Sequence, residues 1–341
     1  AFAAGNKKMA ILTNTAEYLN NVSTETGDVK GGREDLSNAI YDISPTETPF
    51  ISNIGRTKAT GVRHEWQTDS LATAAVNAVD QGRDYVGSVT TYPIAAVAAT
   101  SRIGNVTQIS AKTLIIAGTT EAILKAGRKS ELAYQVAKKG KELKRDVEFN
   151  LAAVSTGELV AVSGTGAKTR GMEKWMSSNV DHNASGATTT TPTTAVTDGT
   201  QRNLTEDLVR GQIQAIWTSG GDPDCILVGP VNKQNISSQF AGIATLYRDA
   251  NSGPATVVGA SDMYIHDFGE LKVVPSRFSR DRTLSILQKD MWAVAYLRPF
   301  KIEKLAKTGD AEKRMLVVEY ALECRNEAAS GKVADLTTSL I

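Results

Sequence analysis

The amino-acid sequence predicts an α+β protein, because one long helix stands among short helical and strand-like segments that follow no regular βαβ order. Residues 130–154 hold apolar side chains at helical spacing, within a stripe about 100° wide. The members of this stripe are Leu132, Val136, Leu143, Val147, Leu151 and Val154, with Gly140 among them. Charged side chains cover the rest of the wheel, namely Lys138, Lys141, Glu142, Lys144, Arg145, Asp146 and Glu148. The pattern indicates a structural helix about 35–40 Å long, with one dry and one solvated face.

The composition is that of a soluble globular protein with about two domains: 341 residues, of which 41% are hydrophobic. The 38 basic and 37 acidic residues leave a net charge of +1, which argues against a dedicated nucleic-acid binder. The longest apolar run, residues 94–99, is far shorter than the roughly 18 residues that a membrane helix needs. Cys225 and Cys324 each lie in an apolar run, which predicts buried, reduced thiols and synthesis in the cytosol. Either removal of an initiator methionine or cleavage of a longer pro-segment would explain why the given sequence begins with Ala1 and not with methionine.

Residues 1–43 are polar and weakly periodic, which predicts an arm that lies on another surface, with a short helix at 33–41. A helix-start signal follows: Ser44 can cap, Pro45 suits the first helical position, and Glu47 can bond back to the cap. We therefore expect a fixed elbow between the arm and the body.

The next segment predicts a long two-stranded hairpin. Residues 63–68 alternate as a strand does, and residues 100–109 supply an antiparallel return. About thirty residues rich in Ala, Gly, Thr and Asp lie between them. An isolated hairpin is marginally stable in water, so this one would have to rest on a neighbour. Residues 112–116 then lead into a short helix at 119–126, and glycines in 156–171 end the long helix.

The rest of the chain predicts a second compact unit and a closing sheet. Residues 183–200, mostly Thr, Ala and Gly, predict an exposed, mobile loop. A helix follows whose apolar face would hold Leu208, Val209, Ile213, Ile216 and Trp217. We further expect a buried strand at 224–228, a helix after Gly229 with Ile236 and Phe240 inward, and strands at 263–268, 271–274, 284–288, 292–297, 300–305 and 314–324. The last three should form a small sheet beside the long helix, against its dry stripe.

The candidate chemical motifs do not predict a catalytic, cofactor-binding or metal site. Residues 163–169 resemble a phosphate-binding loop, but Ala167 and Val162 stand where that loop needs glycine. His64, His182 and His266 are expected in a strand, a loop and a strand, without metal-ligand spacing. No nucleophile elbow G-x-S-x-G occurs.

The charged clusters have solvation as their simplest explanation. The carboxylate pairs Glu142/Asp146 and Glu319/Glu323 would lie on a charged helix face and a polar strand face. The basic residues of 138–145 alternate with acids, and Lys138–Glu142 and Lys144–Glu148 are spaced for ion pairs one helical turn apart. Weak contact with packaged nucleic acid is the alternative for this cluster. We therefore expect a structural protein and no enzyme.

Several segments, in this order, resemble the major capsid proteins of tailed bacteriophages with the Hong Kong ninety-seven fold, and more specifically a podophage-type group. They are residues 33–36 (REDL), 43–50 (ISPTETPF), 64–67 (HEWQ), 105–109 (NVTQI), 142–148 (ELKRDVE), 297–300 (LRPF) and 317–324. The resemblance spans nearly the whole chain except the Thr-rich loop.

This resemblance implies four parts: an N-terminal arm with its elbow (1–54), an E-loop hairpin (55–105), a peripheral domain with the spine helix (106–199 and 291–341) and an axial domain (200–290). It also implies self-assembly through pentamers and hexamers into a head shell around double-stranded DNA, with scaffold, portal and decoration proteins as further partners. The lysine–asparagine cross-link of some members has no matching pair here. The expected place is the virion, after synthesis in the host cytoplasm.

Two rival functions remain open at this stage. One is another phage structural protein, either a decoration or a tail-tube protein, although a tube protein should be richer in strands and lack such a long helix. The other is a hydrolase whose active site is dispersed along the sequence. The near-zero net charge suits a wall around DNA, because a strongly basic inner surface would bind the DNA and impede its packing.

Overall fold

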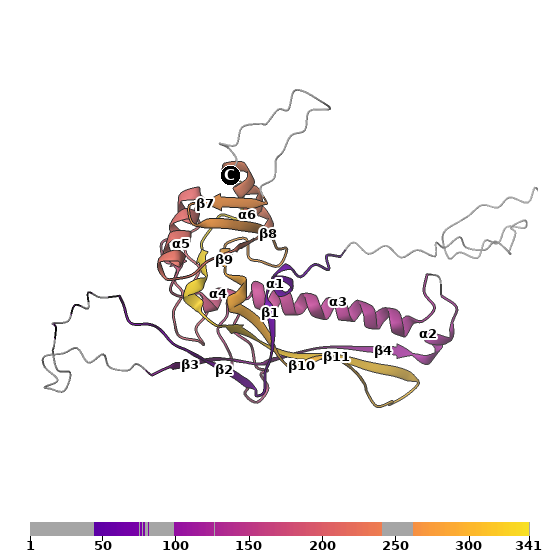
Figure 1. Ribbon diagram of the computed structural model, residues 1–341. Helices are drawn as coiled ribbons and strands as arrows, with labels where there is room; N and C mark the ends of the chain where they lie inside the picture. Colours follow the sequence, from indigo (N-terminus) through magenta and orange to yellow (C-terminus); the bar gives the residue numbers. More distant parts are fainter. Residues whose placement is uncertain are drawn as a thin grey trace, which may run out of the picture.

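The described residues of the computed structural model form two larger sheets and a two-stranded hairpin. One of the larger sheets carries a long helix and the other carries two shorter helices (Figure 1). The structure describes residues 44–74, 76, 78, 81, 99–125, 127–240 and 262–340. The arm, the helix expected at 33–41 and most of the hairpin tip lie outside the described residues.

The long helix α3 runs from Glu131 to Ala152 and confirms the predicted structural helix. Its first turn is capped by Ser130, whose Oγ accepts a hydrogen bond from the backbone N–H of Ala133 at 3.2 Å. Leu143, Val147 and Leu151 are at most 1% exposed, because this part of the stripe packs against a sheet.

That sheet has four strands in the order β1-β10-β11-β4. The strands are β1 (Gly55–Lys58), β10 (Trp292–Lys304), β11 (Ala311–Cys324) and β4 (Gln108–Ala117). β1 is parallel to β10, and the other pairs are antiparallel. A Cβ built on Gly140 of α3 would lie 3.8 Å from the Leu316 side chain of β11, so the helix packs closely on the sheet. The predicted packing of the dry stripe on the C-terminal sheet is confirmed.

The strands expected at 292–297 and 300–305 form one bulged strand, β10. Its register against β11 shifts between Tyr296 and Arg298 and again between Arg298 and Lys301. Pro299 has no backbone N–H to donate to the ladder, so the strand accommodates it with an irregularity instead of ending there.

The hairpin pairs β2 (Arg63–Thr68) with β3 (Ser101–Val106), which confirms the predicted antiparallel return. That return was expected to continue to residue 109, but it stops at Val106. Gln108 begins β4, which belongs to the other sheet. The helix expected at 119–126 is shorter: α2 spans Gly118–Ala122.

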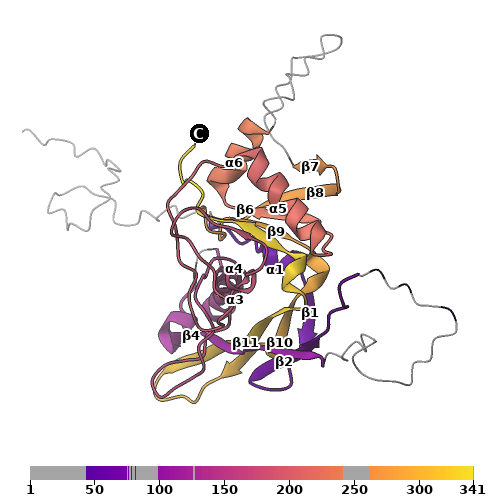
Figure 2. The ribbon, with the colours of Figure 1, turned by 90° about the vertical axis from the view of Figure 1, so that its left-hand side faces the viewer.

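The second sheet has six strands in the order β5-β12-β9-β6-β8-β7. Figure 2 labels four of them, β9, β6, β8 and β7. The six strands are β5 (Val180–Asp181), β12 (Gly331–Val333), β9 (Leu284–Leu287), β6 (Cys225–Val228), β8 (Gly269–Pro275) and β7 (Met263–His266). Helices α5 (Glu206–Thr218) and α6 (Pro230–Gln239) pack beside it. The remaining short helices are α1 (Pro49–Asn53), α4 (Met172–Trp175) and two 3-10 turns, Lys289–Met291 and Glu327–Ala329.

Most of the side chains expected in this second core are there, with one exception. Val209, Ile213, Ile216 and Ile236 are essentially inaccessible, whereas Trp217 is 54% exposed and stacks on Phe268 with ring centroids 5.0 Å apart. Trp217 lies at the edge of the apolar arc of α5, where the sheet no longer covers it.

Cys225 and Cys324 are buried and free, as predicted. Among the described residues, none of the helices combines the length and the apolar character that crossing a membrane requires.

Candidate functional site: the hairpin root, the elbow and the loop clamp

The root of the hairpin is fixed to the body of its own chain. Trp66 of β2 donates its indole N–H to the carbonyl oxygen of Cys324 at 3.0 Å, and its ring lies 5.4 Å from that of Trp175. The guanidinium of Arg170 lies 3.9 Å from the Trp175 ring centroid. Because these contacts are internal, only the part of the hairpin beyond the root is left to rest on a neighbour.

A buried carboxylate ties the same root to Arg170. Glu158, 5% exposed, accepts from Arg63 of β2 and from Arg170, each at 3.0 Å. Both cations therefore share one acceptor inside the protein, which orients the start of β2 relative to the segment before α4.

Two carboxylates that the sequence placed in solvent are buried in β11, and this expectation was wrong. Glu319 and Glu323 are 6% and 7% exposed. Glu319 accepts from Thr107 at 2.9 Å and from Arg298 at 2.7 Å. They are covered because β11 is an inner strand of its sheet and β3 crosses beside it.

Glu323 is the junction between β11, β1 and β2. It accepts from Thr57 at 2.7 Å and from Arg325 at 3.1 Å, and the His64 Nε2 lies 3.1 Å away. Burial alone would raise the pKa of Glu323, but the hydrogen bonds from Thr57, His64 and Arg325 hold that pKa below its ordinary value. The group therefore acts as an ionised anchor.

The elbow forms, but it begins later than the sequence indicated. Residues 44–47 are not helical, and α1 starts at Pro49. Glu148 of α3 caps it from outside: its two carboxylate oxygens accept from the backbone N–H groups of Phe50 and Ile51 at 2.7 and 2.9 Å. Glu148 was expected on the solvated face and paired with Lys144; it is 0% exposed instead. Burial raises the pKa of Glu148, and the two backbone hydrogen bonds only partly oppose this.

The other charged side chains of α3 are partly exposed to solvent. Glu142 pairs with Lys139 at 2.7 Å, not with Lys138, and the hydrogen bond from Lys139 outweighs burial in lowering the pKa of Glu142. Asp146 pairs with Lys112 of β4 at 2.7 Å. Residues 44–46 cross this face and, with basic side chains of α3, line a small crevice of about 70 Å³. The segment before α1 therefore lies beside part of the charged cluster for which solvation was expected and weak contact with nucleic acid was the alternative.

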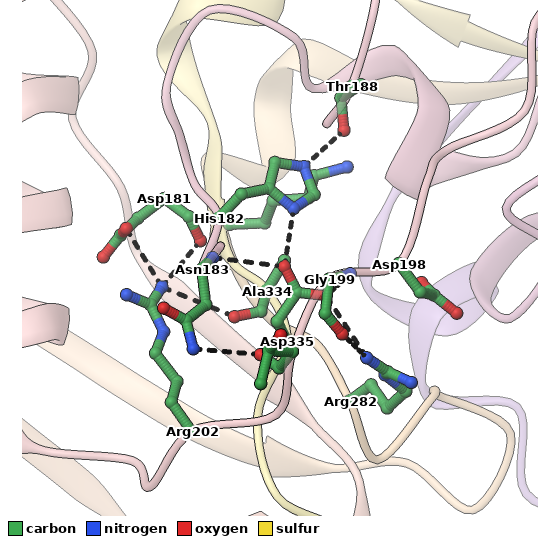
Figure 3. Close-up of polar contacts among 12 residues, drawn as sticks. Asp181, His182, Asn183, Thr188, Asp198, Gly199, Arg202, Arg282, Ala334 and Asp335 are labelled. Carbon is green, nitrogen blue, oxygen red and sulfur yellow. Dashed lines mark hydrogen bonds and ion pairs between the residues drawn. The ribbon is translucent and has the colours of Figure 1, made fainter. Parts of the chain in front are cut away.

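The Thr-rich loop is held at both ends by one carboxylate, Asp335 (Figure 3). Asp335 is 1% exposed and accepts from the backbone N–H groups of Asn183 at 3.2 Å and Gly199 at 2.6 Å. Burial alone would raise its pKa, yet the hydrogen bonds from His182, Gly199 and Asn183 keep the pKa of Asp335 below its ordinary value. We call these contacts the loop clamp.

Three further side chains complete the loop clamp (Figure 3). His182 places Nδ1 3.0 Å from Asp335 and Nε2 2.9 Å from the Thr188 hydroxyl. Arg282 lies 3.4 Å from Asp335 and also donates to the carbonyl of Gly199. Arg202 pairs with Asp181 at 3.0 Å. The loop at 183–200 was expected to be mobile, and the structure shows instead that its backbone is fastened at both ends.

The remaining motif candidates stay apart. His64 lies in β2, His182 after β5 and His266 in β7, and no three potential metal-ligating side chains gather anywhere in the described residues. Residues 163–169 belong to a tight turn in which Val162 and Thr165 exchange backbone hydrogen bonds of 2.9 and 3.2 Å. Gly164 in this turn has φ = 81°, in the region that glycine adopts most readily.

The functional contacts that sequence reasoning missed are those of Glu148, Asp335 and Arg282. Each joins segments more than fifty residues apart, as 97 residues separate Glu148 from Ile51. A local pattern carries no signal for such a partner.

Comparisons with known proteins agree with this architecture. The sequence model of the SU10 major capsid protein family matches residues 12–337. The major capsid protein of Escherichia phage Phieco32 is 25% identical over 346 residues, covering 89% of this chain and 94% of that protein.

Solved structures give the same fold. The capsid of Cyanophage P-SCSP1u has a TM-score of 0.55 at 12% identity, covering 89% of this chain and 92% of its own. A Mycobacterium phage Ogopogo structure has a TM-score of 0.54 at 10% identity, covering 89% and 96%. Since the family match spans nearly the whole sequence, this chain belongs to the SU10 major capsid protein family and is a phage major capsid protein with the Hong Kong ninety-seven fold.

Proposed function

We propose that copies of this capsid protein associate through pentamers and hexamers into a head shell that encloses double-stranded DNA. The observation that supports this most is the hairpin: its root is fixed to its own body, while Leu71 and Val76 beyond the root are each 99% exposed. Apolar side chains that stand so far into solvent are typical of a contact surface for another chain.

The proposed parts keep the boundaries expected above. The arm and elbow (1–54) and the E loop (55–105) supply contacts between copies, the peripheral domain (106–199 and 291–341) is the rigid body, and the axial domain (200–290) lines the five- and six-fold axes. β12 and Leu336 pack with the axial core, so the end of the chain fastens the two domains together.

Further proposed partners are the packaged DNA, touched weakly and without sequence preference, and scaffold, portal and decoration proteins. The net charge of +1 supports weak DNA contact. We propose synthesis in the host cytoplasm and a structural, non-enzymatic role. α3, a helix of 22 residues, speaks against the tail-tube alternative.

Electron microscopy of the expressed full-length chain, alone and with phage scaffold protein, tests this proposal. We expect closed particles in which five-fold and six-fold clusters are visible. A chain that stays monomeric under every assembly condition, and is absent from virions, would contradict it.

A further inference from the structure

Lys332 is a lysine fully enclosed between the six-stranded sheet and α4. It is the central residue of β12 and is 0% exposed. The adjacent Val333 belongs to the core that the sheet shares with α5, and successive side chains of a strand point to opposite faces. Lys332 therefore points to the other face, where its ammonium donates to the backbone carbonyl of Glu173 in α4.

The face of the sheet around Lys332 is mostly apolar and shares a core with α4. Leu227 of β6 and Leu287 of β9 belong to the same hydrophobic core as Met172 and Trp175 of α4. Figure 2 shows α4 on one side of β9 and α5 on the other. We call the region where the sheet closes on α4 around Lys332 the joint. A charge enclosed in such surroundings is costly unless it is fully paired.

The polar groups of the joint are incompletely paired. Ser285 stands directly opposite Lys332 in the register of β9 and β12, and its buried Oγ has no hydrogen-bond partner among the described residues. Glu173 accepts from Arg280 at 2.8 Å through Oε2, but its buried Oε1 has no partner there either. The Lys332 ammonium has three N–H groups and, within the same described ranges, one acceptor. Each buried group left without a partner weakens the closed joint.

The charged groups that face Lys332 do not compensate for its burial. Burial is the largest effect and lowers the pKa of Lys332 from 10.5 to about 8. Glu173 of α4 and Asp335 after β12 oppose this change. Lys174 of α4 and Arg280 before β9 add to it. The two acids and the two bases largely cancel, so the enclosed ammonium keeps most of the cost of leaving water.

The lowered pKa fixes the direction of a pH effect. The closed joint holds the Lys332 proton less tightly than an opened joint, in which water surrounds the ammonium and restores the ordinary pKa. The closed joint therefore gains stability as the pH rises through about 8 toward 10.5, and it loses that stability as the pH falls. Between these two values, one pH unit changes the opening equilibrium by up to about tenfold.

We propose that Lys332 is a pH-sensitive release of the joint: protonation of its enclosed amine favours opening of the six-stranded sheet from α4, and loss of the proton favours closure. The protonation of one side chain thereby sets how readily the two parts of the chain change their relative orientation. This release belongs to the single chain and does not require self-assembly.

The two native thiols report on the opening. Cys225 lies two residues before Leu227 in β6 and so faces the joint, whereas Cys324 lies at the end of β11 in the four-stranded sheet. Both thiols are buried, so each reacts only when its surroundings open. Alkylation of the full-length chain with iodoacetamide in dilute solution, read by peptide mass spectrometry, gives a rate for each cysteine. Division by the rate in the urea-unfolded chain at the same pH removes the intrinsic reactivity of the thiol.

We expect the corrected rate of Cys225 at pH 7 to be at least tenfold above that of Cys324, because the joint opens while the four-stranded sheet stays folded. The corrected rate of Cys225 should then fall by about tenfold or more between pH 7 and 9.5. Equal rates of the two thiols, or a Cys225 rate that does not change with pH, overturn the proposal.

Lys332→Met tests the side chain itself, because methionine is of similar length and carries no charge. The corrected rate of Cys225 in this variant should be at least tenfold below that of the unchanged chain at pH 7, and nearly independent of pH. The control Lys307→Met removes an exposed lysine from the turn between β10 and β11 and should keep the pH dependence. A Lys332→Met chain that keeps it overturns the proposal. The pH profile of the unchanged chain decides the question even if Lys332→Met does not fold.

Discussion

Glu148 caps a helix to which it does not belong, and its carboxylate has no cationic partner among the described residues. The hydrogen bonds to Phe50 and Ile51 satisfy two backbone donors that α1 leaves open at its first turn. The cost is the burial of a charge, which raises the pKa of Glu148. The Glu148 side chain therefore joins the elbow to α3, and it gains or loses its proton at a raised pKa.

This site predicts a specific pH dependence of stability. Because the folded protein holds the Glu148 proton more tightly than the unfolded chain, its contribution is fully present below the ordinary pKa of 4.5 and is lost as the pH rises through the raised value. In the Glu148→Gln variant, this pH-dependent contribution should be absent from the free energy of unfolding. Urea denaturation between pH 4 and 8 measures it. An identical pH profile for both proteins would contradict the assignment.

Truncation of the same side chain should be costly. Glu148→Ala orphans two N–H groups in the elbow, and we expect a loss of about 1–3 kcal/mol for each in the free energy of unfolding. Glu142→Ala, six residues earlier on α3, is the control and should change stability by less than about 0.5 kcal/mol.

Asp335 should also make stability depend on pH, in the opposite direction to Glu148. Its lowered pKa means that its stabilising contribution is present above the ordinary value of 3.8 and is lost as the pH falls through the lowered one.

Asp335→Ala should speed amide hydrogen exchange across residues 183–200, because it removes the acceptor for Asn183 and Gly199. The control is Asp222→Ala, which removes an exposed carboxylate that is not part of the loop clamp and should leave exchange in this loop unchanged.

At the scale of elements, α3 organises the protein because one face packs on the four-stranded sheet and the other meets the elbow. Leu143, Val147 and Leu151 belong to the same core as Leu316, Val318 and Leu322 of β11. The apolar stripe and the sheet strand thus lie more than 160 residues apart in sequence and side by side in the fold.

A pair of substitutions on α3 tests this face assignment. Leu143→Asp buries a charge at a position that is 1% exposed, and we expect the free energy of unfolding to fall by about 3–5 kcal/mol. Lys141→Asp lies on the exposed side and should change it by less than about 1 kcal/mol. Thermal or urea unfolding of both variants measures the difference, and equal losses would show that the faces are assigned wrongly.

At the scale of the molecule, the described residues from 44 onward form two hydrophobic cores. The earliest member of either described core is Phe50, and the last is Leu336. The described body therefore has its own stabilising contacts, and the proposed role of the arm in contacts between copies stays a prediction.

Deletion of residues 1–43 should give a chain whose circular dichroism spectrum keeps the helix and strand signals of the full protein. Its yield of closed particles in electron micrographs should fall at least tenfold. A truncated chain that no longer folds would contradict the role of an arm.

The sequence alone determined the approximate positions of the long helix, of α5 and α6 and of most longer strands, because local periodicity depends on side chains a few residues apart. The short elements β1, α4, β5 and β12 were not predicted. The stripe of α3, the pairing of β2 with β3 and the burial of β6 all follow from such patterns. The order of these elements also indicated the capsid family.

Only the tertiary structure decided which charges are buried and what they bind. Glu148, Glu319 and Glu323 have the local surroundings of solvated side chains, and each is covered by a segment from far along the chain. The same holds for the loop at 183–200, whose composition favours mobility until Asp335 fastens its ends. The physical reason is that burial and hydrogen bonding depend on which distant segments meet, and a local pattern contains no information about that meeting.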